Sequence, residues 1–188
     1  MDDVDQKIIS KLQQDGRTTY YELGKIVGFS SVGAKKRVDK LVEKGILKIS
    51  GLVNLKKLNL QAAFVCIEIE NSEALERLLE RFKECPRVLN IFTTLGAYNL
   101  IALVVAEDQD TLKSISMEKC SLRSGEGIRR SEFIPICNIL YSPFLSVRQS
   151  LIHTEITTAP CNVDCQTCKR YLEECAGCPA VSYYKGNL

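Results

Sequence analysis

The sequence predicts an α+β protein built from consecutive segments, and three observations support this fold class. Three short helical patterns fill the front of the chain. Strand and helix patterns then follow in the order β-α-β-β-α-β. A short tail holds five closely spaced cysteines. We therefore expect a helical domain over residues 1–60, a mixed domain over 61–142, a linker over 143–158 and a Cys-rich module over 159–188.

Composition and charge limit the class of protein. With 45% hydrophobic and 26% charged residues among 188, the chain has the composition of a globular protein. The sequence shows neither a signal peptide nor a membrane-spanning apolar run, so we expect a cytoplasmic protein. Nine cysteines in a reducing compartment indicate metal ligation or redox chemistry rather than disulfides. Residues 1–60 carry twelve Lys/Arg against seven Asp/Glu, which suits a front domain that meets a polyanion.

Each of the three helical patterns has a start signal and a stop signal. Each begins at a residue whose side chain can cap a helix, and each ends at a glycine. In chain order the start and stop residues are Asp3 and Gly16, Thr19 and Gly28, and Ser30 and Gly45. Asp3 and Thr19 are followed three residues later by Gln6 and Glu22, as in a capping box. Because the second and third helices are joined by so few residues, we expect a helix-turn-helix whose third helix enters the DNA major groove.

The third helix supplies the candidate DNA contacts. Side chains near its N-terminus would reach base edges, and basic residues further along would hold backbone phosphates. The candidates are Ser30, Ser31, Val32, Lys35, Lys36, Arg37 and Lys40, with Lys56 and Lys57 as further phosphate contacts. Residues 46–58 alternate enough to form a hairpin, which would be the wing of a winged helix-turn-helix. The same pattern also fits a small helical bundle with a solvated lysine-rich face.

The middle of the chain carries the second pattern. Strands are expected over residues 62–70 and 129–140, helices over 72–86 and 108–120, and two further strands around Gly96. This order is the ferredoxin-like arrangement. Cys66, Cys85, Cys120 and Cys137 fall in these elements at wide spacings, so we expect them to pack in the core.

The front segment DQKIISKLQQDGRTTYYELGKIVGFSSVGAKKRVDKLVEKGIL resembles the winged helix-turn-helix of the Lrp/AsnC, or feast/famine, transcription regulators. The resemblance covers about fifty residues and includes Asp15, Arg17, Ser30, Arg37, Leu41, Gly45 and Ile46. The order of the middle elements also resembles the ligand-sensing and dimerising domain of that family. The resemblance implies a sequence-specific, DNA-binding transcriptional regulator that forms a homodimer or a higher even homo-oligomer. Gly33 and Ala34 replace bulkier residues of the family, so the preferred DNA sequence does not carry over.

The resemblance also implies an effector site in the segment TLGAYNL. Family members commonly read T-G-x-x-D here, and this loop helps to form a small-molecule pocket between dimers. Gly96, Ala97, Tyr98 and Asn99 are therefore the candidate effector-binding residues, but Asn99 replaces the acid. An amide cannot supply the same charge to an ammonium group, so either the effector differs or the site is vestigial. An ordinary β-turn in which Asn99 caps the backbone is the alternative.

No catalytic constellation is found in the sequence. The one histidine, His153, lies in a linker-like segment and is expected to be solvated. There is no glycine-rich phosphate loop, and no Ser or Cys nucleophile has a plausible base nearby. We therefore expect a protein that is not an enzyme.

The tail has the pattern C-x3-C-x2-C-x6-C-x2-C, formed by Cys161, Cys165, Cys168, Cys175 and Cys178. About thirty residues bury too little apolar surface to fold alone, and metal bound by thiolates is the usual remedy in a reducing cell. Two C-x2-C pairs match tetrahedral zinc, so zinc is the expected cofactor. Because five thiols exceed the four that zinc needs, an iron–sulfur cluster is the alternative, and five unligated cysteines are a third interpretation.

These observations predict a DNA-binding regulator modulated by metal or redox state at the C-terminal cysteines. One alternative is an amino-acid-responsive regulator with a purely structural zinc tail. An alternative of another class is an iron–sulfur enzyme or electron carrier. The first three tail cysteines match the cluster motif of radical S-adenosylmethionine enzymes, but too few residues follow them for the barrel of such enzymes. We also expect metal removal to unfold residues 159–188 and to leave the front helices intact.

Overall fold

The structure is a computed structural model that describes residues 1–152 and 155–188. His153, which we expected to be solvated, lies outside these residues. Within the described residues, no helix combines the length and the apolar character needed to cross a membrane.

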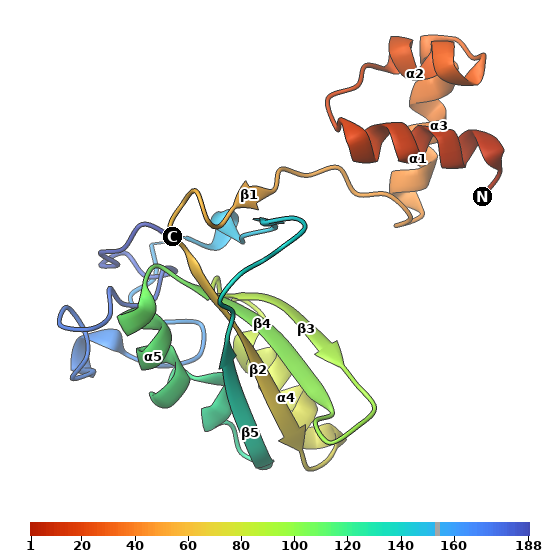
Figure 1. Ribbon diagram of the computed structural model, residues 1–188. Helices are drawn as coiled ribbons and strands as arrows, with labels where there is room; N and C mark the ends of the chain where they lie inside the picture. Colours follow the sequence, from red (N-terminus) through yellow and green to blue (C-terminus); the bar gives the residue numbers. More distant parts are fainter. Residues whose placement is uncertain (153–154) are drawn as a thin grey trace. The chain divides into compact units, whose positions relative to one another are not determined.

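The chain divides into two compact units, Met1–Gly51 and Leu52–Leu188 (Figure 1). The first unit is helical, and the second combines helices with a sheet. The boundary lies at Gly51 rather than at residue 60. Lys56 and Lys57, which we expected to contact phosphates beyond the third helix, therefore belong to the second unit.

The first unit packs three helices around a small apolar core. These are α1 (Asp3–Gln14), α2 (Tyr20–Val27) and α3 (Ser31–Glu43). The core consists of Ile8, Leu12, Leu23, Ala34, Val38 and Leu41. Two expected caps are present: the Glu22 N–H donates to Thr19 Oγ1 at 3.2 Å, and the Gly33 N–H donates to Ser30 Oγ at 3.1 Å. The helix-turn-helix expected from the sequence is confirmed.

The first helix begins one residue earlier than expected. Asp2, rather than Asp3, is its N-cap, and it forms a capping box with Asp5 in place of Gln6. The Asp5 N–H donates to Asp2 Oδ1 at 2.9 Å, and the Asp2 N–H donates to Asp5 Oδ2 at 3.2 Å. Both carboxylates also pair with Arg37 of α3, so this register satisfies the cap and the contact between helices together.

The hairpin expected over residues 46–58 does not form. The segment contributes one short strand, β1 (Val53–Asn54), which pairs antiparallel with β6 (Phe144–Leu145). Val53 lies opposite Leu145, and the Leu55 N–H donates to the Pro143 carbonyl at 3.0 Å. The partner strand lies about ninety residues further along the chain, so local alternation in the sequence could not reveal this pairing.

The second unit contains a four-stranded antiparallel sheet in the order β3-β4-β2-β5. Its elements are β2 (Gln61–Ile69), α4 (Ser72–Phe82), β3 (Val88–Thr93), β4 (Leu100–Ala106), α5 (Gln109–Met117), the 3-10 helix η1 (Leu122–Ser124) and β5 (Ile128–Pro135). The central strand β2 pairs with both neighbours, so that Val65 lies opposite Ala102 and Phe133. The expected α+β, ferredoxin-like fold is confirmed.

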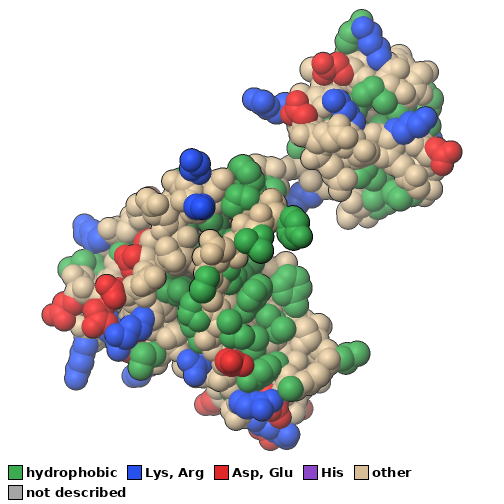
Figure 2. Space-filling view, in the orientation of Figure 1, with side chains coloured by type: hydrophobic (Ala, Val, Ile, Leu, Met, Phe, Trp, Pro, Cys, Tyr) green, Lys and Arg blue, Asp and Glu red, His purple; other side chains and the backbone are tan. Residues whose placement is uncertain are grey.

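The two faces of the sheet differ in what they contact. Successive side chains of a strand point to opposite faces, and α4 lies behind the sheet in Figure 1. The other face, called the open face below, carries Phe64, Phe92, Ile101, Leu103 and Ile134. Phe64, Phe92 and Ile134 are 38, 46 and 41% exposed. Figure 2 shows apolar side chains gathered over this sheet.

The Cys-rich tail shares the core of the second unit. It contains the 3-10 helix η3 (Cys165–Thr167) and follows β6 and the 3-10 helix η2 (Gln149–Leu151). Ala159, Cys161, Val181, Tyr184 and Leu188 are buried in the same cluster as the sheet and α4. The expected module without a core of its own is therefore packed on the middle domain, and part of the expected linker forms β6.

Candidate DNA interface and cysteine-lined cavity

The exposed face of α3 carries most of the predicted DNA contacts. Val32 is 61% exposed, and Ser31, Lys36 and Lys40 are exposed with it. Residues four apart share one face of a helix, so Val32, Lys36 and Lys40 form one stripe along α3, and Ser31 lies beside its N-terminal end. Ser30 lies at the N-cap, where its hydroxyl is used to hold the helix end. The structure thus brings Val32, Lys36 and Lys40 together on one surface of α3.

Lys35 is partly neutralised within the same helix. Its Nζ lies 2.6 Å from Asp39 Oδ2, one turn further along α3. The hydrogen bond to Asp39 raises the pKa of Lys35 above its usual value. Because the pair is exposed and screened by solvent, DNA phosphate or a base edge can compete with Asp39 for the ammonium group.

Arg37 is engaged within the first unit. Its guanidinium donates to Asp2 Oδ2 at 2.7 Å and to Asp5 Oδ1 at 3.1 Å. These ion pairs tie α3 to the N-terminus of α1. A contact from Arg37 to DNA phosphate would require it to share or break these pairs, so its expected phosphate role stays a prediction.

The tight connection between α2 and α3 depends on Gly24, which is not among the residues predicted from the sequence. The Phe29 N–H donates to the Gly24 carbonyl at 2.8 Å, which closes the turn. A Cβ at Gly24 would lie 2.5 Å from the Phe29 carbonyl oxygen, well inside van der Waals contact. Only glycine fits there. The sequence does contain a sign of this role: a glycine inside a helical pattern lowers helix stability, so its presence there indicates a close packing contact.

The predicted effector loop is held by backbone hydrogen bonds. The Ile69 N–H donates to Asn99 Oδ1 and Asn99 Nδ2 donates to the Ile69 carbonyl, each at 2.8 Å. The amide of Asn99 therefore joins the β3–β4 turn to the end of β2. This geometry matches the alternative in which Asn99 caps the backbone.

Other groups of the loop also have partners. Arg130 lies over the Tyr98 ring, 4.7 Å from its centroid, and donates to the Ala97 carbonyl at 3.1 Å. The Tyr98 hydroxyl donates to Glu132 Oε2 at 3.1 Å. Gly96 and Ala97 are exposed. Tyr98 of the loop thus lies beside Arg130 and Glu132 of β5, and the effector role of residues 96–99 stays a prediction.

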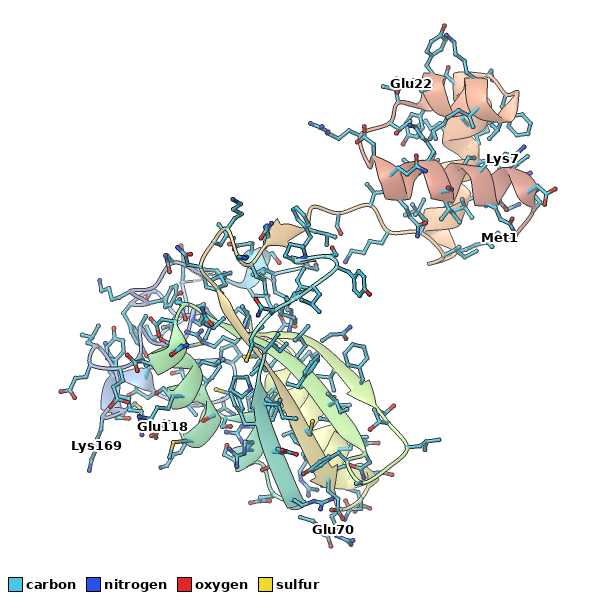
Figure 3. The ribbon with its side chains drawn as sticks, in the orientation of Figure 1. Met1, Lys7, Glu22, Glu70, Glu118 and Lys169 are labelled. Carbon is cyan, nitrogen blue, oxygen red and sulfur yellow. The ribbon has the colours of Figure 1, made fainter. Side chains whose placement is uncertain are left out.

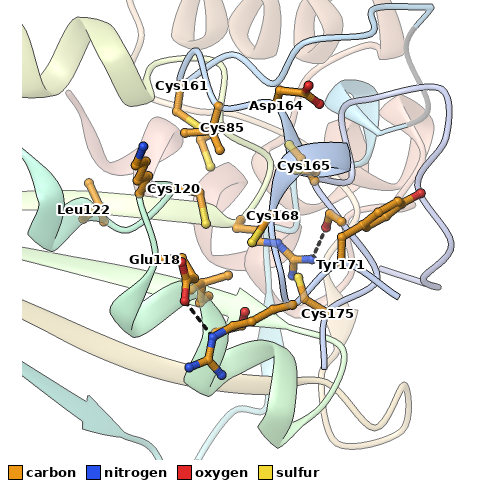
Figure 4. Close-up of a pocket in the computed structure, with 18 of the residues that line it drawn as sticks. Cys85, Glu118, Cys120, Leu122, Cys161, Asp164, Cys165, Cys168, Tyr171 and Cys175 are labelled. Atoms are coloured by element: carbon orange, nitrogen blue, oxygen red, sulfur yellow. Dashed lines mark hydrogen bonds and ion pairs between the residues drawn. The ribbon is translucent and has the colours of Figure 1, made fainter. Parts of the chain in front are cut away.

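The five tail cysteines line a single cavity in the second unit. The cavity has a volume of about 710 Å³ and lies between the tail, α5, the end of α4 and the helix side of the sheet (Figure 4). Cys85 and Cys120 line the same cavity. The other two cysteines lie elsewhere: Cys66 is buried between the strand neighbours Ile101 and Glu132, and Cys137 is exposed. Seven of the nine cysteines therefore line one cavity.

Burial in the cavity raises the pKa of several of these thiols. Burial raises the pKa of Cys165 to about 11 and that of Cys178 to about 12. Burial also raises the pKa of Cys120, and the neighbouring Cys161 and Cys175 add to the shift. A metal that binds here must therefore displace protons from its ligands. Among the described residues, no three Cys, His, Asp or Glu side chains converge closely enough to hold one ion together.

A buried ion pair joins the tail to the sheet. Arg87 pairs with Glu107 through two contacts, Nη1 to Oε2 at 2.6 Å and Nη2 to Oε1 at 2.9 Å. Arg87 also donates to the Gly177 carbonyl at 2.9 Å, and the Tyr184 hydroxyl bonds Glu107. Burial alone would lower the pKa of Arg87, but the Glu107 carboxylate raises it above its usual value. The tail is thereby anchored at Gly177, inside its last C-x2-C pair, and at Tyr184, beyond that pair.

Two further arginines hold the walls of the cavity. Arg170 of the tail donates to Glu118 Oε1 at 2.7 Å, and Figure 3 labels Glu118 beside the C-terminal end of α5. Arg81 of α4 donates to the carbonyls of Cys161 and Lys119. The same α4 side chain thus connects a tail cysteine to the turn that carries Cys120.

Two family models match the chain. The model described as the AsnC-type helix-turn-helix domain matches residues 1–42, and the Lrp/AsnC ligand binding domain matches residues 62–139. Both matches end before the tail cysteines. The first matched range contains α3, and the second contains the sheet with α4 and α5.

Similar proteins are transcription regulators. YezC of Bacillus subtilis, an uncharacterised HTH-type transcriptional regulator, is 36% identical over 123 residues, covering 60% of this chain and 81% of YezC. The HTH-type transcriptional regulator Rv2324 of Mycobacterium tuberculosis is 30% identical over 134 residues, covering 70% and 88%. The transcriptional regulator NMB0573 of Neisseria meningitidis, solved as a complex with L-Met, aligns with a TM-score of 0.67 at 23% identity, covering 76% and 93%. The last likeness shows the fold.

Proposed function

The chain belongs to the Lrp/AsnC family of DNA-binding transcription regulators, and we propose that metal or redox state at its C-terminal cysteines modulates its binding to DNA. It is a regulator and not an enzyme, as its relatives and both family models indicate. One observation carries the proposal: Cys161, Cys165, Cys168, Cys175 and Cys178 line one cavity against α5, the end of α4 and the sheet. Zinc is the metal that the two C-x2-C pairs suit, and iron–sulfur is the alternative.

A metal bound in the cavity would contact elements that pack on the sheet. The walls of the cavity include α5 and the end of α4, both of which pack on the sheet. A ligand changes the behaviour of a protein only through its differential affinity for two states. Metal that fixes the tail against these helices would favour one arrangement of the sensing domain over another.

The test compares operator affinity of the full chain with bound metal and after metal removal. A Cys165→Ser, Cys175→Ser double variant, which removes one thiol from each C-x2-C pair, serves as the uncoupled control. We expect metal to change the Kd of wild type and to leave that of the double variant unchanged. Identical operator affinity in all three samples would reject modulation through these cysteines and would leave any zinc with a structural role.

We propose that DNA is read by the exposed stripe of α3. Lys36 and Lys40 supply the positive charge of this stripe, because the charge of Lys35 is partly neutralised by Asp39. Replacing Lys40 with Gln should weaken binding to all sequences and reduce the salt slope by about one, since one phosphate contact is lost. Replacing Lys36 with Gln should also change sequence preference.

The matched control for these substitutions is Lys7→Gln. Lys7 is exposed on α1 and carries the same charge, so its loss tests net charge alone. Filter binding or fluorescence anisotropy over a range of salt concentrations measures the slopes. Specific binding retained by a Lys35→Ala, Lys36→Ala double variant would reject the assignment of these two residues to the groove.

We also propose a homodimer, or a higher even oligomer, that pairs through the open face of the sheet. The half-exposed apolar side chains of that face support this arrangement. Apolar patches of this kind mark protein interfaces. The two-fold symmetry of such a pair would present two α3 helices to two DNA half-sites.

A small-molecule effector at residues 96–99 is a second candidate regulator, with the tail zinc then purely structural. The match of residues 62–139 to a ligand-binding domain favours it. Since the Asn99 amide is bonded to the Ile69 backbone, recognition would fall to groups such as Arg130 and Glu132. Calorimetric titration with amino acids, repeated on Arg130→Gln, tests it; no heat with any amino acid would reject this candidate.

A further inference from the structure

Two cysteines of the sensing domain lie at the cavity that the tail covers. Cys85 lies in the turn between α4 and β3, and Cys120 follows α5. Figure 4 shows both facing the same space as the labelled tail residues Cys165, Cys168 and Cys175. The sequence predicts ordinary core packing for both, because they fall in the middle elements at wide spacings.

The turns that carry these two thiols are held firmly. Arg148 donates to the Cys85 carbonyl at 3.0 Å, and the Cys85 N–H donates to the Phe82 carbonyl at 3.0 Å. The turn before Cys120 is fixed by the bond from Arg81 to the Lys119 carbonyl. A binding site requires ligands on rigid supports, and both thiols meet this condition.

The number of thiols and their separation favour an iron–sulfur cluster over a single zinc ion. A single zinc ion draws four ligands to about 2.3 Å from one point. Here seven thiols surround a cavity of about 710 Å³, and they come from three separate parts of the chain. In an iron–sulfur cluster the four thiolates are divided among two or more irons of one inorganic core, so the ligands together span more space than those of a single ion. The cavity matches such a cluster.

We propose that the cavity binds an iron–sulfur cluster and that Cys85 and Cys120 supply ligands to it together with tail cysteines. The proposal rests on the proposed function, since it names the centre and adds two ligands from the sensing domain. Each coordinating thiol gives up its proton to solvent as it binds iron. The cluster would join the end of α4, the end of α5 and the tail, so its loss would release three elements at once.

The test uses the full chain purified without oxygen. Iron, acid-labile sulfide, zinc and visible absorption are measured per chain for wild type, Cys85→Ser and Cys120→Ser. Cys66→Ser and Cys137→Ser are the matched controls, because these cysteines do not line the cavity. We expect visible colour in wild type and in both controls. Iron retention should be at least about tenfold weaker in Cys85→Ser and Cys120→Ser, because loss of even a residue that supports a ligand weakens metal affinity by about this factor.

Two additional variants separate ligation from folding. Ile115→Val removes one methylene group from the same cavity wall without removing sulfur, and this variant should retain iron. Cys120→Ala removes the sulfur without placing a hydroxyl on a buried wall, and it should lose iron as Cys120→Ser does. Equal iron loss from Ile115→Val and Cys120→Ser would overturn the assignment of Cys120 as a ligand.

The outcomes distinguish this inference from the proposed function. A colourless wild type that holds zinc overturns the inference but leaves metal modulation through the tail standing. A second result would also overturn the inference and leave metal modulation standing: a coloured wild type, iron loss in Cys165→Ser, and iron retained in both Cys85→Ser and Cys120→Ser. A wild type that binds no metal overturns the inference and also the metal-dependent form of the proposed function.

Discussion

Gly24 allows α3 to follow α2 at the close distance that a helix-turn-helix needs. The Phe29 carbonyl oxygen occupies the space that a side chain at residue 24 would fill. Glycine inside a helix costs about 1 kcal/mol relative to alanine, so its presence here runs against helix propensity. The backbone contact explains why the cost is tolerated.

Replacing Gly24 with alanine should destabilise the first unit by about 1–3 kcal/mol, because the new Cβ meets backbone that cannot move freely. Gly33→Ala is the control: its Cβ would lie 3.5 Å from its nearest neighbours, an ordinary contact, so helix propensity should dominate. Hydrogen exchange of α2 and α3 peptides measures both effects. Exchange in Gly24→Ala that is as slow as in Gly33→Ala would contradict the steric argument.

Arg87 and Glu107 form the most buried ion pair described in the chain, with side chains 7 and 4% exposed. Their mutual attraction offsets the cost of taking two charges out of water only because both are fully bonded. Gly177 and Tyr184 supply part of that bonding from the tail. The pair therefore depends on the tail being in place.

Replacing Glu107 with Gln should cost the second unit about 3–5 kcal/mol, since the Arg87 charge stays buried without its partner. Glu68→Gln is the matched control, because Glu68 pairs with Arg130 at an exposed site and its loss should cost about 0–1 kcal/mol. Denaturant unfolding of both variants gives the comparison. A loss for Glu107→Gln no larger than for Glu68→Gln would show that the tail does not need the pair.

At the scale of elements, the sequence predicted what depends on local chemistry. The caps at Thr19 and Ser30 and the β-α-β-β-α-β order are confirmed, because each follows from residues a few positions apart. The wing was wrong because β1 pairs with β6, about ninety residues away along the chain. The contribution of Cys85 and Cys120 to the cavity was missed for the same reason: wide spacing carries no signal of meeting in space.

The capping box of α2 makes that helix sensitive to acid. The N–H and hydroxyl of Thr19 lower the pKa of Glu22, so the folded pKa is below the unfolded one. The stability from this carboxylate is complete above the unfolded pKa of about 4.3 and is lost as pH falls through the folded value. Protection of α2 amides should therefore fall below about pH 4. Glu22→Gln, which keeps a hydrogen-bonding side chain, should show a weaker pH dependence, and an equal dependence would contradict the assignment.

The tail is an element of the second unit's core as well as a candidate sensor. A chain that ends at Thr157 lacks the buried residues Ala159, Cys161, Val181, Tyr184 and Leu188. Each lost large side chain costs about 2–5 kcal/mol in a core, so truncation should loosen the sheet and α5. Hydrogen exchange should rise throughout the second unit and stay unchanged in α1, α2 and α3. Unchanged exchange in β2 and β4 would mean that the tail is dispensable for the fold.

At the scale of the whole molecule, the proposed homodimer would let two DNA-reading units act together. One α3 helix contacts only a few base pairs, and a symmetric pair reads two half-sites separated by whole turns of DNA. The open face of the sheet is the surface best suited to make that pair, because the other face is covered by helices and tail. The cysteine cavity lies on the covered side, so a metal could act on the helices without occupying the open face.

Replacing Phe64 with Lys should therefore dissociate the assembly, since the new charge would lie among Leu103, Ile134 and the same residues of a second copy. Met117→Lys is the matched control, because Met117 is 65% exposed at the end of α5, away from the open face. Light scattering at micromolar concentration should give a dimer or larger even oligomer for wild type and Met117→Lys and a monomer for Phe64→Lys. Operator binding should weaken with dissociation, because two half-sites are then bound independently. A monomeric wild type, or a Phe64→Lys variant that keeps the mass of wild type, would show that the open face is not the interface.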